Sequence, residues 1–400
     1  MTTLAAPETL RPPRASVGVL GWLRQNLFST WYNALLTLVT LWLLYALLRP
    51  ASAWILTEAQ WEVVTANLRL FMVGQYPAGQ WWRIWLCVYA LGLLAGLSWG
   101  TWGARFRTFA VAIGSAGIFL ALLPFSLDVR LRWFGLAASV VVGWLGGRSP
   151  WPRQLRYGAA AGWLLYFPFV LLIVRGFGSI PAVPRVETSL WGGLLLTFLL
   201  AVVGILFSSP IGVLLALGRR SRLPAIRVFA TLYIELIRGV PLVTVLYMAS
   251  IMLPLFLPEQ IRVDRVVRAM VGFVLFISAY VAEDVRGGLQ AVPRGQYEAA
   301  EALGLPGPLV MGLIVLPQAL RVVIPSLVGQ FISLFKDTSL VAIIGLFDLL
   351  NIGQSVLANP DFLGLHREVY VFAAAIYWVF SYTMSYAARR LEKALGVGER

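Results

Sequence analysis

The sequence predicts an all-α, polytopic membrane protein with about ten transmembrane helices. Of the 400 residues, 59% are hydrophobic and only 12% are charged, a composition far from that of soluble globular domains. Apolar runs of about 18 residues, long enough to cross ~30 Å of hydrocarbon as a helix, recur along the whole chain. The predicted spans are residues 31–48, 82–99, 108–125, 133–147, 158–174, 190–217, 227–255, 266–286, 320–346 and 368–388.

The first part of the chain is predicted to be a cytoplasmic tail followed by a membrane extension. Residues 1–30 hold prolines and arginines, and the first apolar run follows them. That run is long enough to span and lacks a small-residue cleavage site, so we predict a retained helix rather than a signal peptide. Residues 31–185 are predicted to form about five spans, with an outer loop at about 49–81.

Within this extension, small residues indicate packing rather than transport. Gly92, Gly96 and Gly100 recur at four-residue intervals, which places them on one helix face and allows a neighbouring helix to approach closely. Cys87, the single cysteine, lies within a span and is predicted to be a small buried apolar residue. We assign no substrate role to residues before 190.

The second part, residues 186–400, is predicted to hold five further spans and a cytoplasmic loop at about 287–317. The net charge is +14, but the arginines are dispersed among loops that flank the spans, which indicates lipid contact and excludes nucleic acid as a partner. More of them fall inside when both termini are cytoplasmic, as the positive-inside rule requires. We therefore predict cytoplasmic termini and a plasma-membrane location.

Several chemistries are excluded by residue counts. Lys336 and Lys393 are the two lysines, and neither stands in a phosphate-binding loop, so ATP is not hydrolysed on this chain. His366 is the single histidine, which with one cysteine excludes a Cys/His metal cluster. We predict that His366 is solvated in an outer loop. The sequence thus predicts no catalytic, cofactor or metal site and indicates a protein that is not an enzyme.

The segment 298–317, EAAEALGLPGPLVMGLIVLP, is the most specific motif. Strong helix formers open it, Gly304 ends the helix, and two prolines force a turn before the next apolar run. Small alanines let a partner approach, and Glu298 accepts hydrogen bonds from a basic partner residue. The alternative is an ordinary surface helix between two spans. The motif positions are Glu298, Ala299, Ala300, Gly304, Ile314, Leu316 and Pro317.

This motif resembles the cytoplasmic coupling loop of bacterial ABC importer permeases. Three stretches, YIELIRGVPL at 233–242, AYVAEDVRGGLQAVPRGQYEAAEALGLP at 279–306 and FKDTSL at 335–340, resemble polar amino acid ABC permeases. The longer first half, with WLRQNLFSTWYNALLTL at 22–38, is similar to the longer subunits of general L-amino acid transporters.

The resemblance implies a type I ABC importer core over residues 186–400, in the inner membrane. It implies a second, similar permease subunit as partner, in a heterodimer. It also implies an ATPase dimer that holds ATP and Mg, and an extracytoplasmic binding protein. The cargo would be L-amino acids of a polar or general range, moved by alternating access.

Two groups of ionisable residues are candidates for the pathway or gate. Arg238 is predicted ~16 Å deep, counted at 1.5 Å per residue, with Glu235 as its partner three positions earlier on the same helix face. Gly239 and Pro241 should break the helix there. The alternative is that Glu235 and Arg238 only neutralise each other at a subunit interface.

Lys336, Asp337, Thr338 and Ser339 form the second group, at mid-depth if the span restarts after Pro325. Neighbouring residues point about 100° apart, so Lys336 and Asp337 do not simply pair. The two hydroxyls could meet the substrate or cap a half-helix. Gating or structural ion pairing is the alternative to substrate contact.

Glu283, Asp284 and Arg286 lie near the cytoplasmic end of their span and are predicted to brace the coupling loop. Two rival functions remain. An ion-gradient-driven secondary transporter would show inverted internal symmetry, which the spans 31–174 and 190–388 do not. A membrane scaffold would dock an ATPase without moving solute.

Overall fold

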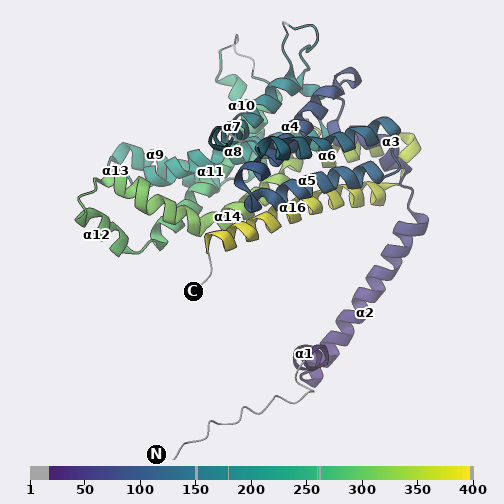
Figure 1. Cartoon of the computed structure of the whole chain (residues 1–400), viewed down its shortest axis with the longest axis horizontal. Coiled ribbons are helices and arrows are strands. Elements are labelled where there is room, and N and C mark those ends of the chain that lie inside the picture. Colours follow the sequence, from purple (N-terminus) through teal and green to yellow (C-terminus); the bar gives the residue numbers. More distant parts are fainter. Residues whose placement is uncertain (1–17, 149–151, 179, 259, 261–262, 397–400) are drawn as a thin grey trace, which may run out of the picture. The chain divides into compact units, whose positions relative to one another are not determined.

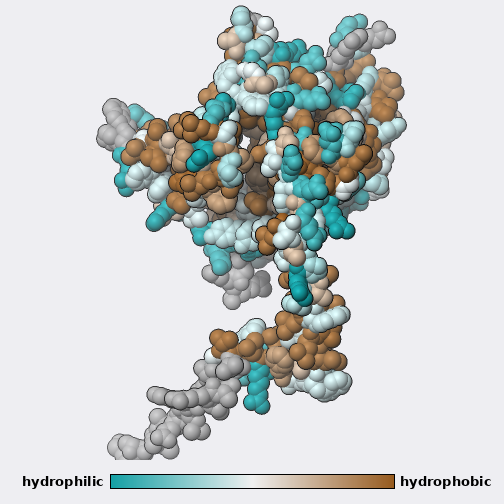
Figure 2. Space-filling view, turned by 90° about the vertical axis from the view of Figure 1, so that its right-hand side faces the viewer, coloured by the Kyte–Doolittle hydropathy of each residue, from teal (hydrophilic) through white to brown (hydrophobic). Residues whose placement is uncertain are grey.

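The computed structural model describes residues 18–148, 152–178, 180–258, 260 and 263–396, and this part of the chain is helical with two isolated β-bridges as its only extended pairing. Nine helices there are long and apolar enough to cross a membrane, and a bent helix pair brings the number of candidate spans to ten. The predicted fold class is thus confirmed. Large apolar areas cover the exposed surface, as Figure 2 shows.

The chain divides into two compact units, Met1–Glu62 and Val63–Arg400. In the first, α1 (Val19–Asn26) precedes α2 (Trp31–Ala53), which continues as a π-helical turn, Trp54–Glu58. The side chain of Thr30 caps α2 by accepting from Asn33 N at 3.4 Å. α2 has no buried residue, so its whole apolar surface is available to lipid or another chain. Residues 1–17 of the predicted tail lie outside the described residues.

The second unit opens with five helices, and the densest packing among them joins α4 to α6. These helices are α3 (Glu62–Val73), α4 (Trp81–Trp102), α5 (Ala104–Leu122), α6 (Leu127–Gly147) and α7 (Pro152–Arg175). Gly92, Gly96 and Gly100 all face α6, and a Cβ on Gly96 would stand 2.0 Å from the carbonyl oxygen of Val140. The predicted packing role of these glycines is confirmed. Cys87 is buried, as predicted.

The remaining helices surround α8 (Gly193–Arg219) and α11 (Arg265–Ala291), which carry many of the fully buried side chains. Figure 1 shows them among α9 (Pro224–Arg238), α10 (Leu242–Leu255), α12 (Arg294–Ala302), α13 (Gly307–Leu309), α14 (Leu316–Asp337) and α16 (His366–Leu395). A π-helical segment, Val310–Val315, precedes α14, and a 3₁₀ segment, Thr338–Ile344, leads from it to α15 (Leu349–Leu357). The first half packs onto this core, since Tyr76, Val174 and Leu200 share one apolar cluster.

Pro241 and Pro325 affect their helices differently: the chain bends next to the first and continues as a helix through the second. The predicted span 227–255 is two helices, α9 and α10, bent by 108°, so the predicted break at Gly239 and Pro241 is confirmed but a straight span is wrong. Pro325 lies inside α14, which runs unbroken past it. The expected restart of the span after Pro325 is therefore wrong, because neighbouring helices tolerate the lost hydrogen bond of an internal proline.

Candidate functional site

Helix α12 forms the short, stopped helix that the coupling motif predicts. It begins after Pro293 and ends at Ala302, and Gly304 adopts a left-handed conformation with φ of 75°. Gly304 N donates to Glu301 O at 2.9 Å, and Leu305 N donates to Ala300 O at 3.3 Å. These bonds close the end of the helix, which explains why a residue without a Cβ is needed there.

The exposed side of α12 carries the acidic and small residues of the motif. Glu298 and Ala299 are exposed, whereas Ala300 is only 4% exposed and packs onto the core. In Figure 1, α12 protrudes with α13 at one end of the helical bundle, beyond the ends of its long helices. The outward face of α12 is therefore acidic, and its small side chains let a partner approach closely.

Two polar contacts join α12 to the helices that precede and follow the loop. Arg220 Nη1, just after α8, donates to the hydroxyl of Tyr297 at 3.3 Å, and its guanidinium lies 5.9 Å from the ring centroid. Gln318, on the first turn of α14, donates from Nε2 to Gln296 Oε1 at 3.2 Å. A displacement of α12 would therefore pull on both α8 and α14.

The last motif residues lie where the π-helical segment becomes α14. Ile314 and Leu316 pack against the main apolar cluster, and Pro317 directly follows the π-helical segment at the start of α14. The carbonyl of Ile314 accepts from Gln318 Nε2 at 2.8 Å. These residues thus fix the join between the loop and α14.

Above the loop, Glu283 on α11 holds three arginines from three helices. Arg286 Nε donates to its Oε1 at 2.9 Å, Arg219 Nη1 lies 3.4 Å from Oε2, and Arg238 Nη1 lies 3.7 Å from Oε2. Arg219 also pairs with Glu235 at 2.8 Å. The cluster therefore ties α8, α9 and α11 together with three positive and two negative charges.

This geometry corrects the first candidate pair. Glu235 pairs with Arg219 and Arg238 with Glu283, so the predicted pairing of Glu235 with Arg238 is wrong. α9 ends in a bend at Gly239, and Arg238 lies beside Arg219, the last residue of α8, where both contact Glu283, so the residue count behind the predicted depth of Arg238 does not apply. The depth count assumed one straight span. Arg238 also lies 5.5 Å from the Tyr280 ring centroid, as a cation–π contact.

Asp284 makes a separate link between α11 and α14. Its Oδ1 accepts from Ser326 Oγ at 2.8 Å, and its buried Oδ2 has no hydrogen-bond partner. Glu283, Asp284 and Arg286, the three residues predicted to brace the loop, thus all lie at or beside contacts between helices near the coupling loop. Bracing itself stays a prediction.

The second candidate group lies at the far end of α14 from the coupling loop. Asp337 is its last residue, ~32 Å along the helix from Leu316, and the restart after Pro325 on which the mid-depth position depended does not occur. Thr338 Oγ1 donates to Phe335 O at 2.8 Å and Ser339 Oγ to Lys336 O at 2.9 Å. These hydroxyls bond the preceding turn and cap no restarting half-helix. Lys336 is exposed.

Sequence reasoning missed a buried network around Asp348, which is fully buried after the 3₁₀ segment. Its Oδ1 accepts from Asn351 N at 3.1 Å, capping α15, and from Asn351 Nδ2 at 2.6 Å, while its Oδ2 accepts from the hydroxyl of Tyr377 at 2.7 Å. Burial raises the pKa of Asp348, and these donors partly oppose that shift. An aspartate between apolar runs was the signal that could have revealed it.

Nothing in the described residues forms a group of three or more His, Cys, Asp or Glu side chains suited to a metal ion. His366 is the first residue of α16, exposed, with its ring 6.4 Å from that of Tyr370. The candidate site is therefore one of helix contacts and charge pairs.

The chain is similar to several known proteins. A family model described as the binding-protein-dependent transport system inner membrane component matches residues 208–397. The inner membrane amino-acid ABC transporter permease protein YhdY of Escherichia coli is 43% identical over 406 residues, which cover 97% of each chain. BztC of Rhodobacter capsulatus, described as a glutamate/glutamine/aspartate/asparagine transport system permease protein, is 34% identical over 457 residues and 98% of each chain.

Among solved structures, an amino acid ABC transporter crystallised with histidines is 31% identical, covers 50% of this chain and 92% of its own, and has a TM-score of 0.46. The similarity to YhdY extends over nearly the whole of both chains, the extension before residue 190 included. The chain belongs to the family of amino-acid ABC transporter permeases of the inner membrane.

Proposed function

We infer that this chain is the permease subunit of an ATP-driven importer, which translocates L-amino acids delivered by an extracytoplasmic binding protein. A separate ATPase dimer would hold ATP and Mg and drive alternating access through α12. The observation that carries this is the protruding α12, with Glu298 exposed at its outer face and Tyr297 and Gln296 bonded to the ends of α8 and α14. The cargo class, L-amino acids of polar or general range, follows the family.

The mechanism uses α12 as a lever on the helices it is bonded to. When the ATPases close, α12 would move with them, and the bonds from Tyr297 and Gln296 would transmit that movement to α8 and α14. The Glu283 cluster then joins α8 to α9 and α11, so the movement reaches the bend between α9 and α10. Alternating access needs helices with two discrete packings, and the bent pair is the element suited to that.

The orientation of the chain in the membrane is inferred from the end of the bundle at which α12 protrudes. Gly396, just beyond α16, lies next to Arg321 near the start of α14, so α16 ends on the side where α12 protrudes. An α12 that faces the ATPase puts this end in the cytoplasm, and the excess of arginines in those loops supports it. With ten spans, both termini are cytoplasmic. A second, similar permease completes the pathway, and the extended first half favours a heterodimer.

The test is uptake of radiolabelled glutamate, glutamine, leucine and histidine into proteoliposomes that hold this chain with its co-purified partners. ATP and binding protein are each added or omitted. Glu298→Lys is compared with Asp361→Lys, an equal charge reversal at an exposed position outside the loop. We expect uptake to require both ATP and binding protein, to be lost in Glu298→Lys together with co-purified ATPase, and to persist in Asp361→Lys.

Three results would contradict the proposal or one of its parts. Uptake that needs an ion gradient and no ATP would identify a secondary transporter. Wild-type chain that binds the ATPase but imports no solute, with Arg238→Gln and Lys336→Gln indistinguishable from it, would identify a docking scaffold. If Glu298→Lys still bound the ATPase and kept full uptake, α12 would not be the element that couples the two.

A further inference from the structure

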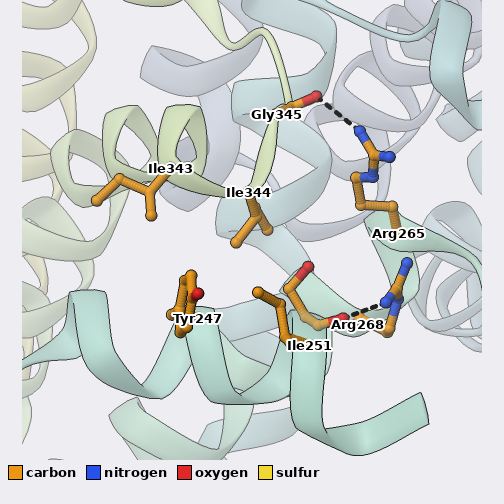
Figure 3. A pocket seen from close by; sticks show the side chains of 8 residues that line it. Tyr247, Ile251, Arg265, Arg268, Ile343, Ile344 and Gly345 are labelled. Atoms are coloured by element: carbon orange, nitrogen blue, oxygen red, sulfur yellow. Dashed lines mark hydrogen bonds between the residues drawn. The ribbon is translucent and has the colours of Figure 1, made fainter. Parts of the chain in front are cut away.

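A cavity of about 320 Å³ opens between α10, the first turn of α11 and the 3₁₀ segment that follows α14 (Figure 3). Arg265 and Arg268 line it from α11, and Tyr247 lines it from α10. Ile343 and Ile344 supply an apolar wall from the 3₁₀ segment. The volume lies at the low end of the range for small-molecule sites, which suits a single amino acid better than a peptide.

The two arginines face this cavity with unused donors. They are three residues apart, so they share one face of α11. Arg265 Nη1 donates to Gly345 O at 3.3 Å and Arg268 Nη1 donates to Ser250 O, bonds that orient the guanidinium groups without neutralising them, as Figure 3 shows. The Nε of Arg268 is buried without a hydrogen-bond partner. A carboxylate would complete this donor set.

No acidic side chain neutralises the pair within the described part of the chain. None of the lining residues is acidic, and neither guanidinium takes part in a salt bridge there. Asp264, the acidic residue next to Arg265, is engaged elsewhere, since it accepts from Val266 N at 2.8 Å and from the hydroxyl of Thr188. Counted over the described residues that line it, the cavity therefore carries an excess of positive charge.

The position fits the route of an incoming solute. Arg265 begins α11 and Ala291 ends it, 27 residues or ~40 Å later, where the chain turns into α12. The cavity thus lies at the opposite end of α11 from the coupling helix. With α12 in the cytoplasm, the cavity is on the side where the binding protein releases its cargo.

We propose that this cavity is a selectivity site, which binds the carboxylates of an acidic amino acid and admits anionic amino acids in preference to cationic ones. The proposal rests on the proposed import function and adds the substrate class. Glutamate has one net negative charge at neutral pH, glutamine none, and lysine one net positive charge, so affinity should fall in that order beside two guanidinium groups. The isoleucines contact the methylene groups, and the bidentate geometry of arginine fixes the carboxylates.

The first experiment measures equilibrium binding of tritiated L-glutamate to the purified transporter complex without ATP or binding protein, with glutamine and lysine as competitors. Arg265→Gln and Arg268→Gln should each weaken binding about tenfold or more, as expected for loss of a charge-assisted bond. Arg268→Lys should retain part of the affinity. Arg367→Gln, which removes the same charge from an exposed position at the start of α16, should stay within about twofold.

A second measurement needs no arginine substitution and so does not depend on how the variants fold. The single native cysteine, Cys87, is buried, so Ile343→Cys, at a position 50% exposed, would be the accessible thiol of this chain, whose labelling is read on its own gel band. L-Glutamate should slow its labelling by a charged thiol reagent, and L-lysine at equal concentration should not. Labelling that neither amino acid changes would overturn the proposal.

Other outcomes separate this proposal from the function it rests on. ATP-dependent import of neutral or basic amino acids, with glutamate bound no better than lysine, would overturn the selectivity site and leave the importer standing. Arginine variants that keep glutamate affinity but lose stimulation of ATP hydrolysis by loaded binding protein would show a docking surface for that protein instead. Failure of every amino acid to enter with ATP and binding protein would overturn the importer and the selectivity site together.

Discussion

Glu283 and Asp348 are both carboxylates that join several helices, yet their surroundings differ in charge and in exposure. The side chain of Glu283 is 22% exposed and faces three arginines, whose own partners include Glu235. Asp348 is fully buried and faces neutral donors from Asn351 and Tyr377. Partly hydrated ion pairs can exchange partners at low cost, whereas buried neutral donors cannot leave their acceptor cheaply. The comparison indicates a movable junction near the coupling loop and a fixed one at the opposite end of α14.

The largest effect should come from Asp348→Ala. The change removes the cap of α15 and leaves the Tyr377 hydroxyl and the Asn351 amide buried without an acceptor, which we expect to lower the free energy of unfolding by about 3 kcal/mol. Unfolding in SDS–detergent mixtures, followed by tryptophan fluorescence, measures it. Asp361→Ala, at an exposed position, is the control and should change stability by under about 0.5 kcal/mol. A similar loss in both variants would refute the fixed junction.

The next effect is the part of the pH dependence of stability that Asp348 contributes. Burial raises its pKa, so the folded protein keeps the proton to a higher pH than the unfolded chain does. Over that interval the folded state binds more protons, and the free energy of unfolding falls as pH rises, by at most about 1.4 kcal/mol per pH unit. The free energy of unfolding of wild type should therefore fall relative to that of Asp348→Asn as the pH rises above about 4. A difference that is constant with pH would contradict this environment.

A smaller loss is expected from Glu283→Gln, which leaves Arg238 and Arg286 without a carboxylate partner among the described residues. Because all the side chains are partly hydrated, we expect only about 1 kcal/mol in stability. Uptake should fall more than stability does, since the variant removes the ion pairs that join α8 and α9 to α11. Parallel measurements of SDS unfolding and ATP-dependent uptake decide it. Unchanged uptake would show that the cluster is merely surface charge pairing.

The smallest effect belongs to Glu235→Gln. Glu235 is 56% exposed and has Arg219 as its one ion-pair partner within the described chain, and Arg219 keeps Glu283 as an alternative. We expect a change in stability under about 0.5 kcal/mol and uptake close to wild type. If Glu235→Gln proved as damaging as Glu283→Gln, the order of importance within the cluster would be reversed.

The sequence predicted what depends on local chemistry and missed what depends on distant contacts. The short helix ending before Gly304, the break at Gly239 and the packing face of Gly96 follow from properties of single residues or their spacing, and the structure confirms them. The pairing of Arg238 was predicted wrongly, because its partner Glu283 lies on another helix, far away in the sequence. Sequence reasoning counted Arg265 and Arg268 only as loop charges, since the walls of their cavity come from α10 and a segment near residue 344.

The π-helical segment Val310–Val315 gives the loop a defined angular step. Its hydrogen bonds run to the fifth residue, so it holds about one residue more per turn than an α-helix would. If those bonds changed to the fourth residue, everything on the loop side would turn by about 100° about the axis of α14. A Cβ added to Gly312, within the segment, would meet no atom within 4 Å, whereas Val310 and Val315 at the two ends of the segment are buried. Rotation of the loop against α14 would thus occur in whole residues of register rather than by gradual bending.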